Sequence, residues 1–182
     1  MKRALSVFLL AVCLLLAGCG GQADEKRFAA FSEDLAAKDS LSFSSNIRAE
    51  YADRTLEFTL AYEKDAEGQT VSVRKPERIA DIRAHIAPGS QTLEYEGLIL
   101  DTGPLDPYGL SPMNALPKLV EALCTGHLDS HWRENDSLVC HVILDDHLSA
   151  SVWFEPQGMT PTYAELQSGD TVHIFCTISD WS

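Results

Sequence analysis

Short segments in which apolar and polar residues alternate, separated by turn-forming residues, constrain the fold of this chain more than any other feature. The first pair covers residues 41–51 and 56–62, joined across Ala52-Asp53-Arg54. A period of two sends successive side chains to opposite faces and is typical of a half-buried β-strand. Two such strands with a short connection between them predict an antiparallel hairpin.

The same alternation recurs along the rest of the chain. Residues 71–73 begin a third strand that Pro76 ends, because proline donates no hydrogen bond to a sheet. The pattern continues through residues 80–86 up to a turn at Pro88-Gly89. The remaining predicted strands cover residues 93–95, 98–100, 137–144, 147–154, 160–167 and 171–178. Regularly spaced short strands of this kind predict an antiparallel meander.

One segment near the start has helical periodicity instead. Within residues 24–38, the apolar residues Phe28, Phe31 and Leu35 recur at i, i+3 and i+7. Acidic residues at the start of this segment and Lys38 at its end suit the dipole of a helix. We expect a first helix with one apolar stripe.

A second helical segment lies in the middle of the chain. Ser111-Pro112 indicates an N-cap followed by proline at the first helical position, and apolar residues continue to a C-cap at Gly126. Pro117 leaves two alternatives, a short turn followed by a helix from Pro117 or one kinked helix. Two helices cannot cover both faces of such a sheet. We therefore expect an α+β domain, a curved antiparallel half-barrel with the N-terminal and mid-chain helices packed on its concave face.

The first twenty residues carry an export signal. Lys2 and Arg3 form a basic start, residues 4–16 are almost wholly apolar, and Leu16-Ala17-Gly18-Cys19 closes the run. This ending resembles the lipobox of bacterial lipoproteins, in which cleavage precedes the cysteine and its sulfur carries a diacylglyceryl group, with palmitate as an expected acyl chain.

A plain signal peptide or a membrane-spanning helix is the alternative, but spanning needs about 20 apolar residues. We expect a signal peptide at 1–18, a lipidated tether at 19–23 and a domain at 24–182. The protein would sit on the extracytoplasmic face of the cell membrane, held by lipidation of Cys19.

The net charge restricts the partners. It is −13 with neutral histidines, and removal of Lys2 and Arg3 takes it to −15 (−13 minus 2). Binding to nucleic acid needs Lys and Arg on the phosphates, and adhesion to anionic lipid needs polybasic clusters. We therefore expect no nucleic acid partner, and a domain whose own charge keeps it off the lipid surface.

Three cysteines remain beyond the lipobox, Cys124, Cys140 and Cys176. An odd number in an exported chain allows one disulfide with a spare thiol or three reduced cysteines. We favour cysteines that pack as small apolar residues. Cys140 and Cys176 share the parity of their apolar neighbours, so both should point into the core.

Three stretches resemble the LolA/LolB-type lipoprotein localisation family. They are Val73-Arg74-Lys75-Pro76-Glu77-Arg78-Ile79, Ala87-Pro88-Gly89 and Leu93-Glu94-Tyr95-Glu96-Gly97-Leu98. In that family a strand ends in a basic-Pro segment, and a later strand runs into an acidic-Gly corner. The order of elements is also similar over nearly the whole mature chain. The resemblance implies a half-barrel closed by a helical lid, with an apolar cavity that receives acyl chains.

The sequence also departs from that family. The soluble carrier of the family is not lipidated, so Cys19 makes this chain more similar to the outer-membrane receptor. The receptor has an apolar residue on a protruding loop, and Leu105, Tyr108 or Leu110 could take that part here. Lipid-anchored proteins of similar outline include the germination lipoprotein of clostridia, whose role is as a protein partner.

Catalytic and metal signatures are weak. His127 and His131 are four residues apart, but on a strand and turn that spacing does not bring them together as a helix would. Gly109-Leu110-Ser111-Pro112-Met113 lacks the second glycine of a nucleophile elbow, and we find no glycine-rich phosphate loop. We expect no enzymatic activity, no catalytic residues, no cofactor and no metal.

Two functions remain open. In the first, the concave face binds or carries a lipid or other acyl-bearing ligand. The residues expected to line that site share the inward parity of the early strands, with one from the mid-chain helix: Phe43, Ile47, Leu56, Phe58, Leu60, Val71, Val73 and Leu119. In the second, these side chains fill the core themselves, and the domain is an anchored module that binds an envelope protein, similar to the germination lipoprotein.

Overall fold

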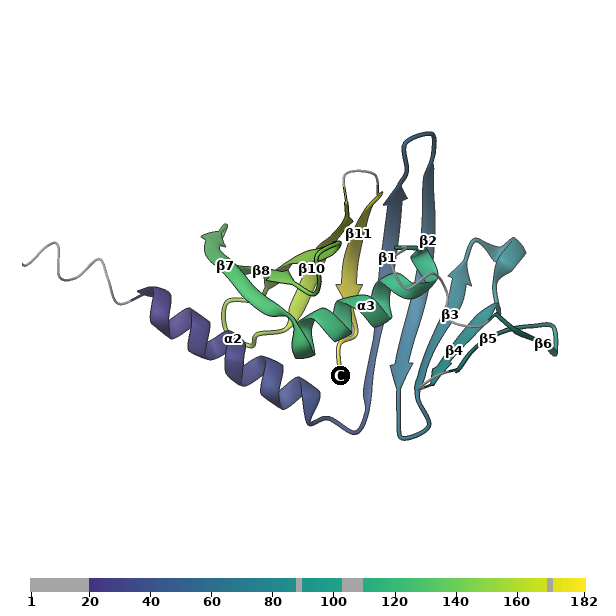
Figure 1. Ribbon diagram of the computed structural model, residues 1–182, viewed down its shortest axis with the longest axis horizontal. Helices are drawn as coiled ribbons and strands as arrows, with labels where there is room; N and C mark the ends of the chain where they lie inside the picture. The colour runs from purple at the N-terminus through teal and green to yellow at the C-terminus, as the bar shows by residue number, and fades with distance from the viewer. Residues whose placement is uncertain (1–19, 88–89, 103–109, 170–171) are drawn as a thin grey trace, which may run out of the picture.

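The computed structural model describes residues 20–87, 90–102, 110–169 and 172–182, and within them the chain forms one eleven-stranded antiparallel sheet with two α-helices (Figure 1). The helices are α2 (Gly20–Ala36) and α3 (Pro112–Thr125), with a short 3-10 helix, η1 (Glu77–Ile79). The strands are β1 (Leu41–Glu50), β2 (Thr55–Lys64), β3 (Gln69–Lys75), β4 (Arg83–Ala87), β5 (Ser90–Tyr95), β6 (Leu98–Asp101), β7 (His127–Glu134), β8 (Ser137–Ile143), β9 (Leu148–Phe154), β10 (Pro161–Ser168) and β11 (Val172–Ser179).

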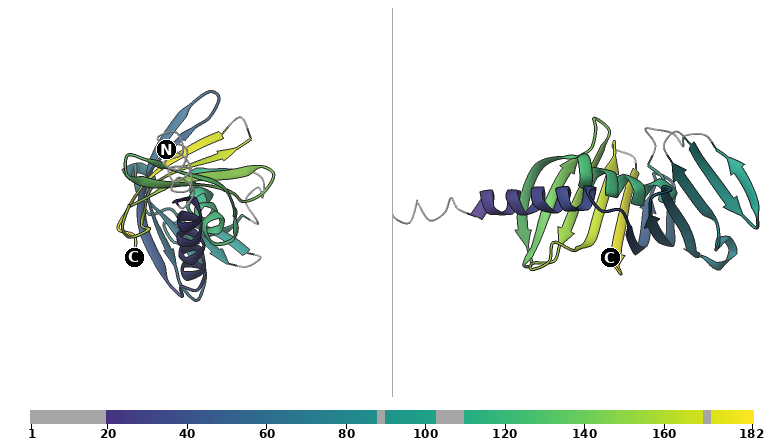
Figure 2. Two further views of the ribbon diagram at one scale, coloured as in Figure 1. Left: turned by 90° about the vertical axis from the view of Figure 1, so that its left-hand side faces the viewer. Right: turned by 90° about the horizontal axis from the view of Figure 1, so that it is seen from below.

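The sheet consists of two meanders joined at the middle. Its strand order is β6-β5-β4-β3-β2-β1-β11-β10-β9-β8-β7, so the first and last strands of the chain pair with each other. In that pairing Ile47 lies opposite Cys176. The sheet curves around the helices and does not close, because β6 and β7 remain its edges (Figure 2). The prediction of an α+β half-barrel is confirmed.

Helix α3 crosses the concave face, where it contacts strands from both meanders. A capping box starts it: Ser111 Oγ accepts a hydrogen bond from the Asn114 N–H, and the Asn114 side chain accepts one from the Ser111 N–H. The helix runs without interruption through Pro117. Of the two alternatives at that proline, the structure therefore has the single helix.

Gly126 ends α3 for a steric reason. Its backbone is extended, with φ −69°, so no left-handed conformation demands glycine there. A Cβ at this position would lie 2.4 Å from Val142 Cγ1 and 2.5 Å from the Ala122 carbonyl oxygen. The absence of a side chain lets the end of the helix approach β8 closely.

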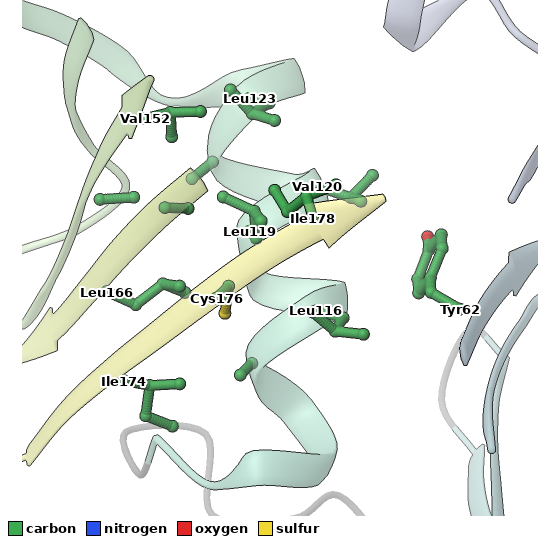
Figure 3. Packing of buried hydrophobic residues seen from close by; sticks show 14 of the residues in the cluster. Tyr62, Leu116, Leu119, Val120, Leu123, Val152, Leu166, Ile174, Cys176 and Ile178 are labelled. Atoms are coloured by element: carbon green, nitrogen blue, oxygen red, sulfur yellow. The ribbon is translucent and has the colours of Figure 1, made fainter. Parts of the chain in front are cut away.

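The core lies between α3 and the sheet (Figure 3). Leu116, Leu119 and Leu123 of α3 are fully buried, and Leu166 and Ile174 face them from β10 and β11. The alternation read from the sequence holds along the first strand, where every odd-numbered residue from Leu41 to Ala49 is buried. One face of the sheet therefore supplies the apolar surface that the helices cover.

Helix α2 covers the β7 end of the concave face and contacts α3 and β7. Phe28 and Phe31 pack edge-on against Phe154, with ring centres 6.2 and 5.1 Å apart. Arg133 of β7 donates to both carboxylate oxygens of Asp24, at 2.7 and 3.2 Å. The apolar stripe is as predicted, but the helix begins at Gly20, so residues 20–23 of the expected tether are helical.

One predicted strand is wrong at its start. The alternating run at residues 80–86 suggested a strand throughout, whereas β4 begins at Arg83 and η1 precedes it. Asp81 has a φ of 72°, which no strand adopts, and its N–H donates to the Val73 carbonyl oxygen. The Val73 N–H in turn donates to the Ile82 carbonyl oxygen, so the chain folds back onto β3 before β4 starts.

The predicted burial of two cysteines is confirmed. Cys140 and Cys176 are fully buried, and Cys124 is half-buried. All three are free thiols in this structure. Cys19 and the expected turn at Pro88-Gly89 lie outside the described residues.

Candidate functional site

Six of the residues predicted to line a ligand cavity are buried by the protein's own side chains. They are Phe43, Ile47, Leu60, Val71, Val73 and Leu119. Phe43 stacks between Tyr62 and Trp181, with ring centres 4.9 and 4.7 Å away. Tyr62 is itself buried, and its hydroxyl donates to Gln69 Oε1 at 3.1 Å. The structure brings these residues together as packed core.

The remaining two predicted residues, Leu56 and Phe58, are only partly buried because β3 leaves β2 beside them. The β2–β3 ladder ends where Thr59 lies opposite Lys75, and Pro76 then turns the chain into η1. Residues 55–58 of β2 therefore have no strand partner on that side, while β1 still pairs with them on the other. We call this place the sheet split.

An apolar hollow of about 410 Å³ opens at the sheet split. Leu56 and Phe58 form one side of it, and Pro76 and Ile79 form the other. The bonds that fold residues 81 and 82 back onto Val73 hold η1 in place, and η1 carries Ile79. The charged residues at the rim are Glu57 and Arg78. A hollow with apolar walls and a charged rim suits an apolar group that enters from water.

A second hollow, of about 670 Å³, adjoins the first and shares Glu57, Phe58 and Pro76 with it. Most of its lining comes from outward-pointing residues on the convex face: Asn46, Arg48, Thr59, Lys75, Tyr163, Phe175 and Thr177. We call it the outer groove. It offers hydrogen-bond donors and acceptors beside three aromatic rings, those of Phe58, Tyr163 and Phe175, so it suits a polar group better than the apolar hollow does.

Three polar side chains of the outer groove, Arg48, Thr59 and Asn46, are held by their neighbours. The guanidinium carbon of Arg48 lies 4.3 Å from the centre of the Phe175 ring, and the same guanidinium pairs with the Glu50 carboxylate. Thr59 Oγ1 donates to Asn46 Oδ1 at 2.9 Å. These contacts fix the side chains before any ligand arrives.

Tyr163 anchors the far side of the outer groove. Its ring packs edge-on against Trp153, with centres 5.1 Å apart. Burial raises the pKa of its hydroxyl to about 12, helped by the hydrogen bond that it donates to Glu165 Oε1 at 3.0 Å. The hydroxyl is therefore protonated near neutral pH.

The outer groove was not predicted from the sequence. Its residues occupy the polar phase of the alternation, which indicates a solvated face. The visible signal was the presence of Trp153, Tyr163 and Phe175 at outward positions, where a solvated strand would place smaller polar residues. Their gathering on neighbouring strands depends on the pairing of β9, β10 and β11, which no local pattern specifies.

The other candidates from the sequence fall elsewhere. Leu110 is buried, so it does not protrude, and Leu105 and Tyr108 lie outside the described residues. His127 and His131 both lie on β7. Within the described ranges there is no group of three or more His, Cys, Asp or Glu side chains that could hold a metal. Within the same ranges, no helix is both long and apolar enough to cross a membrane.

Comparisons with known proteins find similarity in structure. No family model matches the sequence, and no curated protein matches it. Among solved structures, a DUF1329 family protein from Desulfovibrio piger covers 85% of this chain and 90% of its own, at 6% identity and a TM-score of 0.50. An uncharacterized conserved protein from Thermus thermophilus covers 87% and 86%, at 6% identity and a TM-score of 0.50.

A LolA superfamily protein from Nitrosomonas europaea also superposes, over 83% of this chain and 91% of its own, at 11% identity and a TM-score of 0.49. At identities this low, the likeness of the Desulfovibrio and Thermus structures concerns the fold alone. The half-barrel with helices on its concave face is thus an arrangement that solved proteins share.

Proposed function

We propose that this protein is a membrane-anchored extracytoplasmic lipoprotein whose LolA-like domain binds an acyl-bearing amphiphile at the sheet split. The observation that carries the proposal is the adjacency of the apolar hollow and the polar outer groove, which share Glu57, Phe58 and Pro76. An amphiphile has an apolar chain joined to a polar head, and the two hollows offer one environment for each.

The acyl chain belongs in the apolar hollow. Leu56, Phe58 and Ile79 present partly exposed apolar surface there, and covering such surface stabilises a complex by about 25 cal/mol per Å², or about 0.8 kcal/mol for each buried methylene group. The hollow's volume of about 410 Å³ lies within the range of small-molecule sites, which is about 300–1,000 Å³. One acyl chain is a better match than a whole lipidated protein.

The polar head belongs in the outer groove, close to Lys75. Lys75 makes no ion pair with any described residue, while Arg48 is already paired with Glu50. An anionic group on the ligand would give Lys75 a partner, and the hydroxyl and amide groups of Thr59 and Asn46 would bind the rest of the head. The proposed ligand is therefore an amphiphile with an anionic or strongly polar head.

The proposed anchor is Cys19, in Leu16-Ala17-Gly18-Cys19. It precedes Gly20, the first residue of α2, so the lipid would attach directly at the start of that helix. We expect Cys19→Ala to leave the precursor unprocessed or to release the domain from the membrane, measured by fractionation and by the mass of the intact protein. Normal processing and membrane association of Cys19→Ala would refute the anchor.

The ligand proposal is tested with the full chain and a dansylated undecanoic acid as the fluorescent probe. Leu56→Asp places a charge inside the apolar hollow and should weaken binding by about tenfold or more, because it costs at least about 1.4 kcal/mol of apolar contact and desolvation. Ile143→Asp is the matched control, since Ile143 is an exposed aliphatic residue on β8, away from the split. Equal binding by wild type and Leu56→Asp would refute the site.

A second candidate function rests on a different observation. Phe43, Leu60, Val71 and Leu119 are buried by one another and by their neighbours, so the centre of the concave face is filled. This favours an anchored module that binds an envelope protein through its surface. Lipid extraction and mass spectrometry of the gently purified wild type separates the two, because only the first function requires a co-purified amphiphile.

A further inference from the structure

Strand β6 carries three consecutive aliphatic side chains that are exposed to water. Leu98, Ile99 and Leu100 are 70, 69 and 64% exposed. Leu98 and Leu100 lie opposite Tyr95 and Leu93 of β5, on the concave side of the sheet, and Ile99 lies on the convex side. The first three residues of the strand are therefore apolar on both faces, ahead of Asp101 at its end, and proteins expose such patches at interaction sites.

The main chain of Ile99 also faces away from the sheet. The Thr102 N–H donates to the Gln91 carbonyl oxygen at 3.1 Å, so Gln91 and Thr102 form a hydrogen-bonded pair. Such pairs alternate with non-bonded ones in an antiparallel ladder, which makes Glu94 and Ile99 a non-bonded pair. The N–H and C=O of Ile99 thus point outward, where no strand of the described chain pairs with them.

The opposite edge of the same sheet is better protected than β6, whose only charged residue is Asp101 at its end. Strand β7 carries Asp129, Arg133 and Glu134, contains a register shift between Leu128 and Ser130, and has α2 packed against it. Charges, bulges and covering elements are the means by which proteins block unwanted pairing at a sheet edge. Between Leu98 and Leu100 there is no charge, no proline and no register shift.

We propose that β6 is a docking edge, at which an extended segment of another protein adds a strand antiparallel to β6 with apolar residues in its middle and Lys or Arg at its ends. The ladder would form with the outward N–H and C=O of Ile99, and alternate apolar side chains would cover Leu98 and Leu100. This interaction is independent of ligand binding at the sheet split.

The charges near β6 indicate the charge of the segment that would bind there. Strand β5 and its turn into β6 contain Glu94 and Glu96 and no Lys or Arg. Glu94 is 3.1 Å from His85 Nε2, whereas Glu96 is exposed in the turn. The whole chain carries a net charge of −13, so a second copy would be repelled and a basic segment attracted. The partner segment therefore carries positive charge.

Strand β6 is far from the start of α2 (Figure 1), where the membrane anchor is proposed, so its partner is expected to be a protein and not the lipid bilayer. Strand β6 and the first residues of α2 lie at opposite ends of the molecule (Figures 1 and 2). This step rests on the proposed anchor at Cys19: with the lipid attached just before Gly20, β6 would lie at the end of the molecule away from the membrane (Figure 1), within reach of a second protein.

The test uses the full chain and a labelled peptide, Lys-Val-Thr-Val-Thr-Val-Thr-Lys, with a version that has Glu at both ends. Ile99→Pro removes the outward N–H together with the isoleucine side chain, and keeps the hydrogen bonds of Leu98 and Leu100 to β5, because proline is tolerated where an edge N–H faces solvent. Ile99→Thr keeps the N–H and is the control. Glu96→Lys reverses the charge of the turn without touching the strand.

We expect the wild type to bind the Lys-ended peptide more tightly than the Glu-ended one. Ile99→Pro should weaken binding by about tenfold or more, since it removes a main-chain hydrogen bond and blocks the ladder, while Ile99→Thr stays within about twofold. Glu96→Lys should reduce or invert the preference for Lys ends, and this readout stands even if Ile99→Pro fails to fold.

Three results would overturn the docking edge. The first is that the wild type does not bind the Lys-ended peptide. The second is an equal loss of peptide affinity in Ile99→Pro and Ile99→Thr, which would indicate an apolar contact without strand pairing. The third is a dimer in sedimentation that Ile99→Pro dissociates, which would make the occupant a second copy. An unchanged end preference in Glu96→Lys would remove the charge argument and, with it, the proposed partner.

Discussion

Burial determines the chemistry of the cysteines at the scale of single residues. Cys140 and Cys176 are fully buried, and this burial raises the pKa of each thiol to about 12. The thiolate is the reactive form of cysteine, so both thiols are chemically inert near neutral pH. Cys124 is half-buried, and burial raises the pKa of its thiol as well.

We predict that a thiolate-selective reagent at pH 8 labels Cys124 first and reaches Cys140 and Cys176 only on unfolding. The folded thiols hold their protons to about pH 12, whereas an unperturbed thiol titrates near 9.0. Their contribution to stability is therefore complete below about pH 9 and declines as the pH rises toward about 12. Mass-spectrometric mapping of the label is the measurement. Rapid labelling of Cys140 or Cys176 in the native protein would contradict the burial of these two thiols.

Local patterns identify elements better than they identify what the elements touch. The stripe of Phe28, Phe31 and Leu35 predicts a helix, because a 3.6-residue period is a property of the segment itself. The contacts with Phe154 and Arg133 join residues more than 100 positions apart, which no local period encodes. The run at 80–86 shows the converse, since the hydrogen bonds to Val73 override an alternation that suits a strand.

We predict that Asp24→Asn loosens α2 from β7. The hydrogen bonds from Arg133 lower the pKa of the Asp24 carboxyl, so its contribution is present above the ordinary value of 3.8 and is lost as the pH falls through the lowered value. Because Arg133 is half exposed, we expect a loss of only about 1 kcal/mol in the free energy of unfolding at pH 7.

The matched control is Asp34→Asn, since Asp34 is exposed on the same helix. Denaturant unfolding of both variants at pH 7 and pH 3 is the measurement. The difference between Asp24→Asn and wild type should shrink at the lower pH. A loss in Asp24→Asn that is no larger than that in Asp34→Asn would show that the ion pair contributes nothing to docking.

At the scale of the whole molecule, parity predicts which face is buried but not what fills it. The alternation places Leu60, Val73 and Leu56 on one face, and the structure confirms that face. It does not specify that β1 pairs with β11, nor that β3 leaves β2 at Pro76, because both depend on long-range pairing. Because β3 separates from β2 at Pro76, Leu56 lines a partly open hollow while Leu60 and Val73 are packed in the core. The sequence therefore predicts the candidate site only as a set of inward residues.

The pair Phe58→Ala and Leu60→Ala distinguishes a binding site from a filled core. Leu60 is fully buried, and its truncation should cost about 2–5 kcal/mol in the free energy of unfolding without changing ligand content per folded molecule. Phe58 lines both hollows and is only partly buried, so its truncation should cost less than the roughly 3–5 kcal/mol of a packed phenylalanine. It should instead reduce the amphiphile that co-purifies. Unfolding and extracted lipid are measured on the same preparations. Suppose instead that Phe58→Ala costs the full amount for a packed phenylalanine, about 3–5 kcal/mol, and that no lipid is found in the wild type. Side chains rather than a ligand would then complete the packing at the sheet split, and the anchored interaction module would be left as the function.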